Sequence, residues 1–537
     1  MNIAHRVDGL RAPVIWSLLA VAVCWLYSPG ELAFLGDNRG QFFIAERAAS
    51  GVAPHVSSIS GKSSLSFLIS GAGIYIGRTL GIPDYWSVRL LSILVLAVSV
   101  GLAWVVTYGL LSDESNFSSV HARFAAHLAA LSMLSFGGYT YLGAVGARPK
   151  IFLVFFMLLT LLMVLAKRPL GTGVSGTLAF LCWQPALMVL VASALPLWFW
   201  RPRRRALVFW AFGVFLAVAL YEAYFVYHGA WREQLFQTLI FTAKYMAPEH
   251  SSVVKNPARL LRLWRLGFMR FNPAGVCLAL WMVSFWYGLL ANLRSARAVL
   301  QARQASAYVS LCVLGGLAFT LYDHQGYADL FIFIPYLAIA TGAMVIEAER
   351  VIVSRGGRAL RWAVVVILVI VAGVGLDRRD RRHKIDGQLR LAAELAESSS
   401  KLNGIYAVNC THLLALMRSS NWSEYGHFFR GVRELMLDRT SGPDRPPWKE
   451  GVLPDLILVS GQPPPEISAV LQSDYVQVEK PLYTRQGVAV WRRQKRSVPA
   501  WSFQDSPDLF LSETNERFPK TDSAGLRKLS YPEAATP

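Results

Sequence analysis

Long stretches of the chain contain almost no charged residue, and they recur from the N-terminus to about residue 376. A helix needs roughly 20 mostly apolar residues to cross the hydrocarbon core of a bilayer, and fewer where interfacial residues complete the span. A soluble fold could not bury so many apolar segments, so the pattern predicts a polytopic α-helical membrane protein. The nearly charge-free stretches are 14–27, 86–111, 151–166, 186–200, 207–227, 276–290, 309–322, 331–346 and 362–376.

These stretches and their flanks predict about 11 transmembrane helices. A further span is expected at 124–142, and 171–200 is expected to form a hairpin of two short helices bent near Trp183. The segment 63–80 mixes Ser and Gly with apolar residues, which favours a helix lying in the membrane interface. If the N-terminus is cytoplasmic, the odd number of spans places both the loop after the first span and the C-terminus on the outer face.

The composition becomes polar after the last apolar stretch. Short apolar runs bounded by Pro and Gly predict strands, and they alternate with short helical patterns, which is typical of a small soluble α/β domain. The expected strands are 404–408, 455–459, 475–478 and 487–491, and the expected helices are 388–398, 413–418 and 467–471. The predicted organisation is therefore a membrane domain at 1–376 with interfacial helices at about 30–84, an α/β domain at 385–496, and a poorly ordered polar tail at 497–537.

The charge balance adds information about topology. Lys and Arg number 53 against 34 Asp and Glu, a net charge of +19. The basic residues gather at the ends of apolar segments, at 201–205, 294–303 and 350–361, as they do in cytoplasmic loops. No basic groove with interleaved aromatic residues is visible, so nucleic acid is not a predicted partner. A basic run at 378–384 follows the last span and favours a cytoplasmic C-terminus, against the span count.

The most informative motifs lie in and beside the loop that follows the first span. Leu-Gly-Asp-Asn-Arg-Gly-Gln at 35–41 places an acid just outside the membrane, ahead of a predicted helix that Gly51 closes. Gly-Lys-Ser-Ser-Leu follows at 61–65, and Tyr-Trp-Ser-Val-Arg-Leu at 85–90 opens the next span. Far downstream, Tyr-Asp-His-Gln-Gly-Tyr at 322–327 lies between two spans.

The order of these motifs resembles the GT-C superfamily of membrane glycosyltransferases, especially the dolichyl-phosphate-mannose and polyprenyl-phosphate-sugar-dependent transferases. In that family an outer-loop acid precedes a helix ending in Gly, then a Lys-Pro-Pro-Leu-like element, then an Arg-Leu-x-Ser span start. Asp37, Gly51, Lys62 and Arg89 match this order and spacing. The resemblance covers the membrane region, and a soluble C-terminal domain on the outer face also fits it.

The resemblance implies roles for individual residues. Asp37 is the expected catalytic base, because a carboxylate at the membrane surface can take the proton of an acceptor hydroxyl; the alternative is that it only caps the following helix. A polyprenyl phosphate leaving group needs cationic partners, and the candidates are Lys62, Arg148, Lys150 and Arg89. These side chains could instead reach for lipid headgroups. Asp323 and His324 are candidates for contact with the acceptor or the donor.

The implied function is inverting transfer of a sugar from a polyprenyl phosphate to a lipid, glycan or protein acceptor, on the outer (periplasmic) side of the cytoplasmic membrane. The alternatives are a transporter or lipid flippase, for which Glu222 within a span is the main support, and a degenerate relative that acts as an envelope scaffold. No His/Cys cluster with metal spacing is present. Relatives carry paired acids where this chain has Asp37 and Asn38, so a divalent cation as cofactor is left open.

Overall fold

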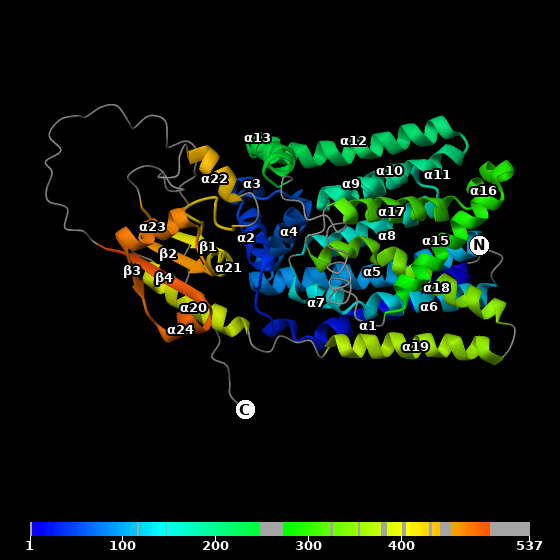
Figure 1. Cartoon of the computed structure of the whole chain (residues 1–537), viewed down its shortest axis with the longest axis horizontal. Helices are drawn as coiled ribbons and strands as arrows, with labels where there is room; N and C mark the ends of the chain where they lie inside the picture. The colour runs from blue at the N-terminus through cyan, green and yellow to red at the C-terminus, as the bar shows by residue number, and fades with distance from the viewer. Residues whose placement is uncertain are drawn as a thin grey trace. The chain divides into compact units, whose positions relative to one another are not determined.

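The computed structural model describes residues 3–114, 118–146, 148–246, 272–322, 326–352, 355–376, 384–399, 404–428, 432–440 and 453–494. Figure 1 shows long helices running side by side through the membrane region and a sheet in the C-terminal part. Six described helical segments are long and apolar enough to cross a membrane. They lie in α1 (Ile3–Leu26), α5 (Asp84–Glu114), α12 (Arg203–Tyr227), α15 (Ala274–Ala291), α17 (Gln304–Tyr322), and η7 (Tyr327–Phe333) joined to α18 (Ile334–Val351).

A bent pair of helices is a seventh candidate span, and four further apolar helical segments are shorter. In the bent pair, α6 (Ser119–Ser135) and α7 (Gly137–Val145) meet at 63°. Four shorter apolar segments of 10–17 residues lie where the remaining spans were predicted. They are α8 (Pro149–Leu165), α9 (Pro169–Cys182), the run of η2 (Gln184–Ala186), α10 (Leu187–Ala192) and α11 (Ala194–Phe199), and the apolar part of α19 (Arg355–Leu376).

The remaining helices of this region are short or lie outside the candidate spans. They are η1 (Pro29–Glu31), α2 (Asp37–Ala49), α3 (Pro54–Ser57), α4 (Leu65–Thr79), α13 (Trp231–Leu235), η3 (Phe236–Met246), η6 (Leu293–Ser295) and α16 (Ala296–Ala302). The expected interfacial helix at 63–80 corresponds to α4, which is not among the candidate spans. The expected hairpin at 171–200 is present, with its bend after Cys182.

Two predicted spans differ in detail from the structure. The stretch 124–142 was expected as one helix, but the chain breaks at Phe136, because Gly137 and Gly138 follow it and glycine weakens a helix interior. The span expected at 327–346 begins with the 3₁₀ segment η7, and the α-helix starts only at Ile334. Pro335 stands in its first turn, where a missing N–H costs no hydrogen bond.

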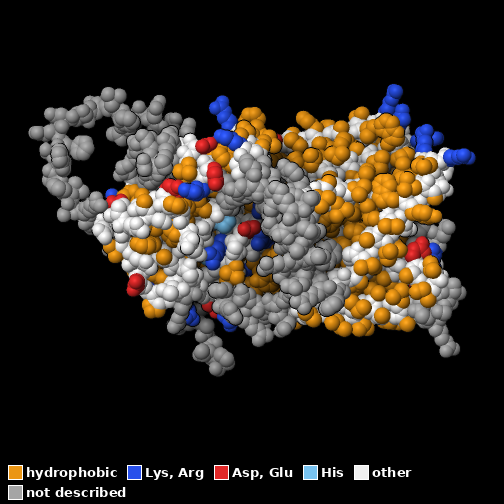
Figure 2. All heavy atoms as spheres, viewed as in Figure 1, with side chains coloured by type: hydrophobic (Ala, Val, Ile, Leu, Met, Phe, Trp, Pro, Cys, Tyr) orange, Lys and Arg blue, Asp and Glu red, His pale blue; other side chains and the backbone are white. Residues whose placement is uncertain are grey.

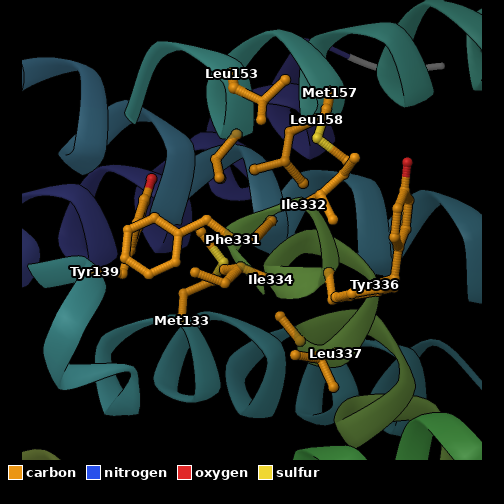
Figure 3. Packing of buried hydrophobic residues seen from close by; sticks show 14 of the residues in the cluster. Met133, Tyr139, Leu153, Met157, Leu158, Phe331, Ile332, Ile334, Tyr336 and Leu337 are labelled. Atoms are coloured by element: carbon orange, nitrogen blue, oxygen red, sulfur yellow. The ribbon is translucent and has the colours of Figure 1, made fainter. Parts of the chain in front are cut away.

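Side chains from five elements fill the centre of the membrane region. Figure 3 shows residues of α6, α7, α8, η7 and α18 pointing toward one another around Phe331. Tyr139 meets Phe331 edge to face at 5.5 Å between ring centroids. Helices α9 and α12 approach closely through Gly173 and Gly213: a Cβ at Gly173 would lie 2.2 Å from the carbonyl oxygen of Trp210. Small residues allow such contacts between membrane helices.

The outer surface of the helices is apolar. Figure 2 shows hydrophobic side chains spread over the face of the membrane helices. On α12, for example, Val208, Phe215 and Leu220 are each about two-thirds exposed. A soluble protein would not expose such a surface, whereas lipid chains cover it without cost. The predicted fold class, a multi-span helical membrane protein with a small α/β domain, is confirmed.

The C-terminal part contains a four-stranded sheet in the order β1-β2-β4-β3. The strands are β1 (Ile405–Val408), β2 (Leu456–Ser460), β3 (Tyr475–Val478) and β4 (Val488–Arg493), and only β1 and β2 pair in parallel. The helices are α20 (Ile385–Ser399), α21 (His412–Leu416), α22 (Val432–Thr440), α23 (Pro465–Asp474) and α24 (Pro481–Arg485). Every residue of β1 is buried, as expected for a strand covered on both faces. The expected strands and helices are all present, whereas α22 and α24 were not predicted, and the tail expected at 497–537 lies outside the described residues.

The α/β domain packs on the loop that follows the first span. Phe34 and Gln388 exchange two hydrogen bonds of 3.0 Å, from the Phe34 N–H to the Gln388 amide oxygen and from the Gln388 amide nitrogen to the Phe34 carbonyl. Phe34 and Phe42 share one apolar cluster with residues of α20, β1 and β2. The chain therefore leaves the last span on the same side as it leaves the first. The first loop and the α/β domain thus share one side of the membrane, as the odd number of predicted spans requires.

Arg39 connects α2 to the α/β domain, and its removal should loosen that domain. Its Nη1 donates to the Asn409 carbonyl at 3.2 Å and to Ser460 Oγ at 2.7 Å. We expect Arg39→Ala to weaken the docking of the α/β domain on α2 by about 1–3 kcal/mol, because the Asn409 carbonyl and the Ser460 hydroxyl lose a charged donor. Hydrogen exchange should then accelerate in α20 through β4, while Arg47→Ala on the same helix serves as the control. Equal exchange in both variants would contradict a docking role for Arg39.

Candidate functional site

Asp37 is the first residue of α2 and lies outside the candidate spans. Gly36 before it adopts φ 52°, a backbone conformation that favours glycine. This turn lets the helix start at the acid, where the helix dipole stabilises a negative charge. The Asp37 side chain is 55% exposed, so a substrate can reach it.

Two cations meet the Asp37 carboxylate. Arg148 Nη1 donates to Asp37 Oδ2 at 3.0 Å, and Lys62 Nζ lies 3.9 Å from the same oxygen. Arg148 is at the N-terminal cap of α8, and its side chain is 16% exposed. Lys62, followed by Arg148, holds the pKa of Asp37 well below its ordinary value. The carboxylate is thus ionised at any physiological pH.

A second ion pair lies within electrostatic range of the first. Lys150 in the first turn of α8 pairs with Asp329 of η7, and both side chains are nearly buried. Lys150 Nζ also lies 4.4 Å from the ring centroid of Trp183, a cation–π contact. Lys62 interacts electrostatically with both ion pairs, that is, with Asp37, Arg148, Lys150 and Asp329. Three cations against two carboxylates leave one surplus positive charge, which favours an anionic ligand.

The loop that carries Lys62 is held by segments from distant parts of the chain. The Gly61 carbonyl accepts hydrogen bonds from the Gln184 amide at 2.8 Å and from Thr242 Oγ1 at 3.0 Å. The Ser60 N–H donates to the Gln237 side chain at 2.8 Å. Burial is the main factor that lowers the pKa of Lys62, and Asp37 opposes it. The Lys62 side chain is 32% exposed, so it is partly shielded from water and still open to a ligand.

A buried network of hydrogen-bonded polar residues also holds the loop that carries Lys62. His55 Nδ1 lies 3.0 Å from the Gln237 amide oxygen, and His55 Nε2 lies 2.6 Å from Ser64 Oγ. The Tyr221 hydroxyl accepts a hydrogen bond from the Ser64 N–H. Burial lowers the pKa of His55 to about 4, so the imidazole is neutral. His55 and Ser64 are fully buried, so this serine–histidine contact orders the backbone and is not open to a substrate.

The structure brings together four of the seven predicted site residues: Asp37, Lys62, Arg148 and Lys150. Arg89 is placed elsewhere. It is fully buried, donates to the carbonyl oxygens of Leu32 and Val145, and lies over the Phe34 ring at 4.8 Å. Its guanidinium thus joins the end of the first span to α7, and we leave it out of the proposed phosphate-binding residues. Asp323 and His324 lie outside the described residues.

Arg89 should act on stability and not on ligand binding. Arg89→Lys removes the planar guanidinium that reaches two carbonyl groups, which leaves at least one buried acceptor without its donor. We expect a loss of about 1–3 kcal/mol in the free energy of unfolding. The affinity for farnesyl phosphate, a short-chain polyprenyl phosphate used as a probe, should be unchanged. Thermal unfolding in detergent and calorimetry measure the two quantities. If affinity falls while stability is kept, Arg89 has the originally predicted role in phosphate binding.

Asp37, Lys62, Arg148, Lys150, Asp329 and His427 together form the charged cluster. Two of its residues were not predicted from the sequence. Asp329 is an acid within the apolar run at 327–337, a signal that could have identified it, since ionisable residues in apparent spans are often functional. His427 belongs to the C-terminal domain, and it interacts electrostatically with Asp37, Lys62 and Arg148. Nothing in the local sequence around His427 indicates this proximity.

The described residues do not fit a resident divalent cation. Among them, no group of three or more His, Cys, Asp or Glu side chains could hold a metal ion. The carboxylates of Asp37 and Asp329 are each paired with a cationic side chain, so a divalent cation would have to displace an existing partner. We therefore derive no step through a metal.

Comparison with known proteins identifies the fold. No family model matches the sequence, and no curated protein matches it. The crystal structure of ArnT from Cupriavidus metallidurans bound to undecaprenyl phosphate is similar over 89% of this chain and 97% of that chain, with 15% sequence identity and a TM-score of 0.58. ArnT in the apo state has the same coverage and identity and a TM-score of 0.56. The archaeal oligosaccharyltransferase AglB from Archaeoglobus fulgidus, in complex with an inhibitory peptide and a dolichol-phosphate, covers 90% of this chain at 10% identity and a TM-score of 0.44.

The similarity to ArnT extends over the membrane helices and the α/β domain together. The predicted architecture, a multi-span helical membrane domain followed by a small α/β domain, is therefore shared with ArnT. An identity of 15% establishes the fold alone, and the chemistry of the site has to be argued from the residues of this chain.

Proposed function

We propose that this protein, whose fold is that of ArnT, transfers a sugar from a polyprenyl phosphate to a hydroxyl group of a lipid, glycan or protein acceptor, with inversion at the anomeric carbon. The observation that carries the proposal is the contact of Arg148 and Lys62 with Asp37. A carboxylate and two cationic side chains lie together at one accessible point outside the candidate spans. An acceptor hydroxyl needs the base, and a phosphate leaving group needs the cations.

In the proposed step, the acceptor oxygen attacks the anomeric carbon from the face opposite the phosphate. The bond between that carbon and the phosphate oxygen breaks, and the polyprenyl phosphate leaves with the bonding electron pair. Asp37 takes the proton of the acceptor hydroxyl. Lys62 and Arg148 balance the charge that develops on the leaving phosphate, and Lys150 adds to the positive potential.

The ion pairs also suggest how the base becomes active. Without substrate, Lys62 and Arg148 hold the pKa of Asp37 low, which makes it a weak base. A donor phosphate competes with Asp37 for the same two cations. When the donor phosphate binds, the Asp37 carboxylate loses part of its interaction with Lys62 and Arg148. The pKa of Asp37 then rises toward its ordinary value. Donor binding thus prepares Asp37 to accept a proton.

The proposal assigns separate tasks to the two regions. The membrane domain at 1–376 binds the donor and carries the chemistry, and the α/β domain at 385–496 binds the acceptor. Because the α/β domain packs on the loop that holds Asp37, both lie on one side of the membrane. We propose that this is the outer, periplasmic face of the cytoplasmic membrane, where the span count places it.

The experiment uses the full-length protein in lipid nanodiscs and a panel of polyprenyl-phosphate-linked pentoses and hexoses. Release of polyprenyl phosphate is measured with membrane lipid extract as the acceptor and with water alone. We expect release from at least one donor, and about 10²–10⁴-fold slower release from the Asp37→Asn variant. The proposal fails if no donor loses its sugar and farnesyl phosphate does not bind the protein.

A further inference from the structure

His427 of the α/β domain lies against the helix that carries Asp37. A Cβ at Gly40 would meet the His427 ring at 3.3 Å, so the imidazole packs directly on the backbone of α2. Gly40 follows Asp37 by three positions, and residues at this spacing share one face of a helix. His427 also interacts electrostatically with Asp37, Lys62, Arg39 and Arg148. The α/β domain therefore extends into the charged cluster of the membrane domain.

Both chain neighbours of His427 are held by one residue. Asn409 adopts φ 58°, a left-handed conformation that Asn tolerates better than most residues. Its N–H donates to the Gly426 carbonyl at 2.8 Å, and its side-chain oxygen accepts from the Phe428 N–H at 2.8 Å. These two hydrogen bonds fix the backbone on either side of His427, which lies between Gly426 and Phe428.

The same residue is tied back to α2. Arg39 Nη1 donates to the Asn409 carbonyl at 3.2 Å, and Arg39 follows Asp37 by two positions. A chain of hydrogen bonds thus leads from α2 through Arg39 and Asn409 to the segment of His427, which packs again on α2 at Gly40. This closed arrangement fixes the imidazole relative to Asp37, although the two residues belong to different domains.

The surroundings keep the imidazole neutral. Burial lowers the pKa of His427, and Lys62, Arg39 and Arg148 lower it further, while Asp37 opposes them. A neutral imidazole presents one donor and one acceptor nitrogen. It can hydrogen-bond a sugar or acceptor hydroxyl without competing with Lys62 and Arg148 as a cation.

We propose that His427 is a substrate-contacting residue of the transferase site, supplied by the α/β domain, which hydrogen-bonds the hydroxyl-bearing acceptor beside Asp37. The inference rests on the function proposed above. Docking of the α/β domain then completes the acceptor side of the site, and the donor phosphate is bound by the membrane domain alone.

The first test follows the imidazole directly. Full-length protein labelled with ¹³C at histidine Cε1 gives signals from ten histidines, and His427→Gln identifies the signal of His427. We expect its pKa to fall in Asp37→Asn, since the nearby anion is lost, and to rise when farnesyl phosphate binds, since an anion is added. Farnesol, which lacks the phosphate, is the matched probe and should leave the pKa unchanged.

The second test separates the acceptor from the donor. With the donor that the wild type turns over, His427→Ala should lower transfer to membrane lipid extract by about tenfold relative to hydrolysis by water, the loss expected for one substrate hydrogen bond. Affinity for farnesyl phosphate should stay unchanged, and His427→Gln should recover part of the transfer because an amide keeps a donor and an acceptor. His121→Ala, at a helix start remote from the site in sequence, is the control.

The outcomes distinguish this inference from the proposed function. If farnesyl phosphate binds but neither the His427 signal nor the transfer ratio of His427→Ala changes, the inference is wrong and the proposed function stands. If farnesyl phosphate does not bind and no donor is turned over, both are wrong.

Discussion

Replacing Asp37 by asparagine should reduce sugar transfer by about 10²–10⁴-fold, the range that a positioned general base contributes. The amide has nearly the shape of the carboxylate but cannot take the acceptor proton. Affinity for farnesyl phosphate should be unchanged or higher, because Lys62 and Arg148 lose the anion that now occupies them. Transfer is measured with the donor selected from the panel, and affinity by calorimetry in nanodiscs.

This combination of results separates a catalytic Asp37 from a structural one. If Asp37 only caps α2, the variant should keep its turnover per folded molecule, because asparagine caps a helix about as well as aspartate. Glu31→Gln is the matched control, since Glu31 is an exposed acid of the same loop, paired with Lys384. Normal transfer by Asp37→Asn would remove the central residue of the proposed function.

Replacing Lys62 by methionine should weaken binding of farnesyl phosphate by about 10–100-fold, since a charge-assisted hydrogen bond contributes roughly 1.5–3 kcal/mol. The methionine side chain keeps the unbranched shape of lysine and most of its length but carries no charge. The same variant should raise the pKa of Asp37, because Lys62 is the largest cause of its lowering. Calorimetry measures the affinity, and the pH dependence of binding reports the carboxylate.

A double-mutant cycle tests whether Lys62 alternates between the carboxylate and the phosphate. If both compete for the ammonium, the loss of affinity caused by Lys62→Met should be larger in the Asp37→Asn background than in the wild type. Lys244→Met, which removes an exposed lysine of η3 paired with Asp438, is the matched control. Equal losses in both backgrounds would argue against competition, and no loss in either would exclude Lys62 from the phosphate site.

Much of the fold could be predicted because its signals are local. A run of apolar residues indicates a span wherever it occurs, and the expected strand 475–478 agrees with β3 because its pattern lies within a few residues. The errors are local too. The break at Phe136 depends on two glycines that an apolar average does not reveal, and the 3₁₀ start of the segment at Tyr327 depends on hydrogen bonds made before Pro335.

The candidate site was predictable only in part. Asp37 and Lys62 were identified through motif order, and Arg148 and Lys150 through their position at the start of a span. Arg89 was a candidate for the same reason, since it also lies near the start of a span. The sequence does not reveal whether a cation at this position faces a ligand or a backbone carbonyl. The carbonyl groups that bind it belong to Leu32 and Val145, and no property of the sequence near Arg89 reveals them.

The sequence by itself determines a membrane protein with an α/β domain and an acid at the start of the helix after the first span, because hydrophobicity and helix signals act over short distances along the chain. Which cations pair with that acid, and that a histidine of the far C-terminal domain joins them, follow from packing between segments hundreds of residues apart. Charge interactions depend on distance in space, and distance in space is a property of the folded chain.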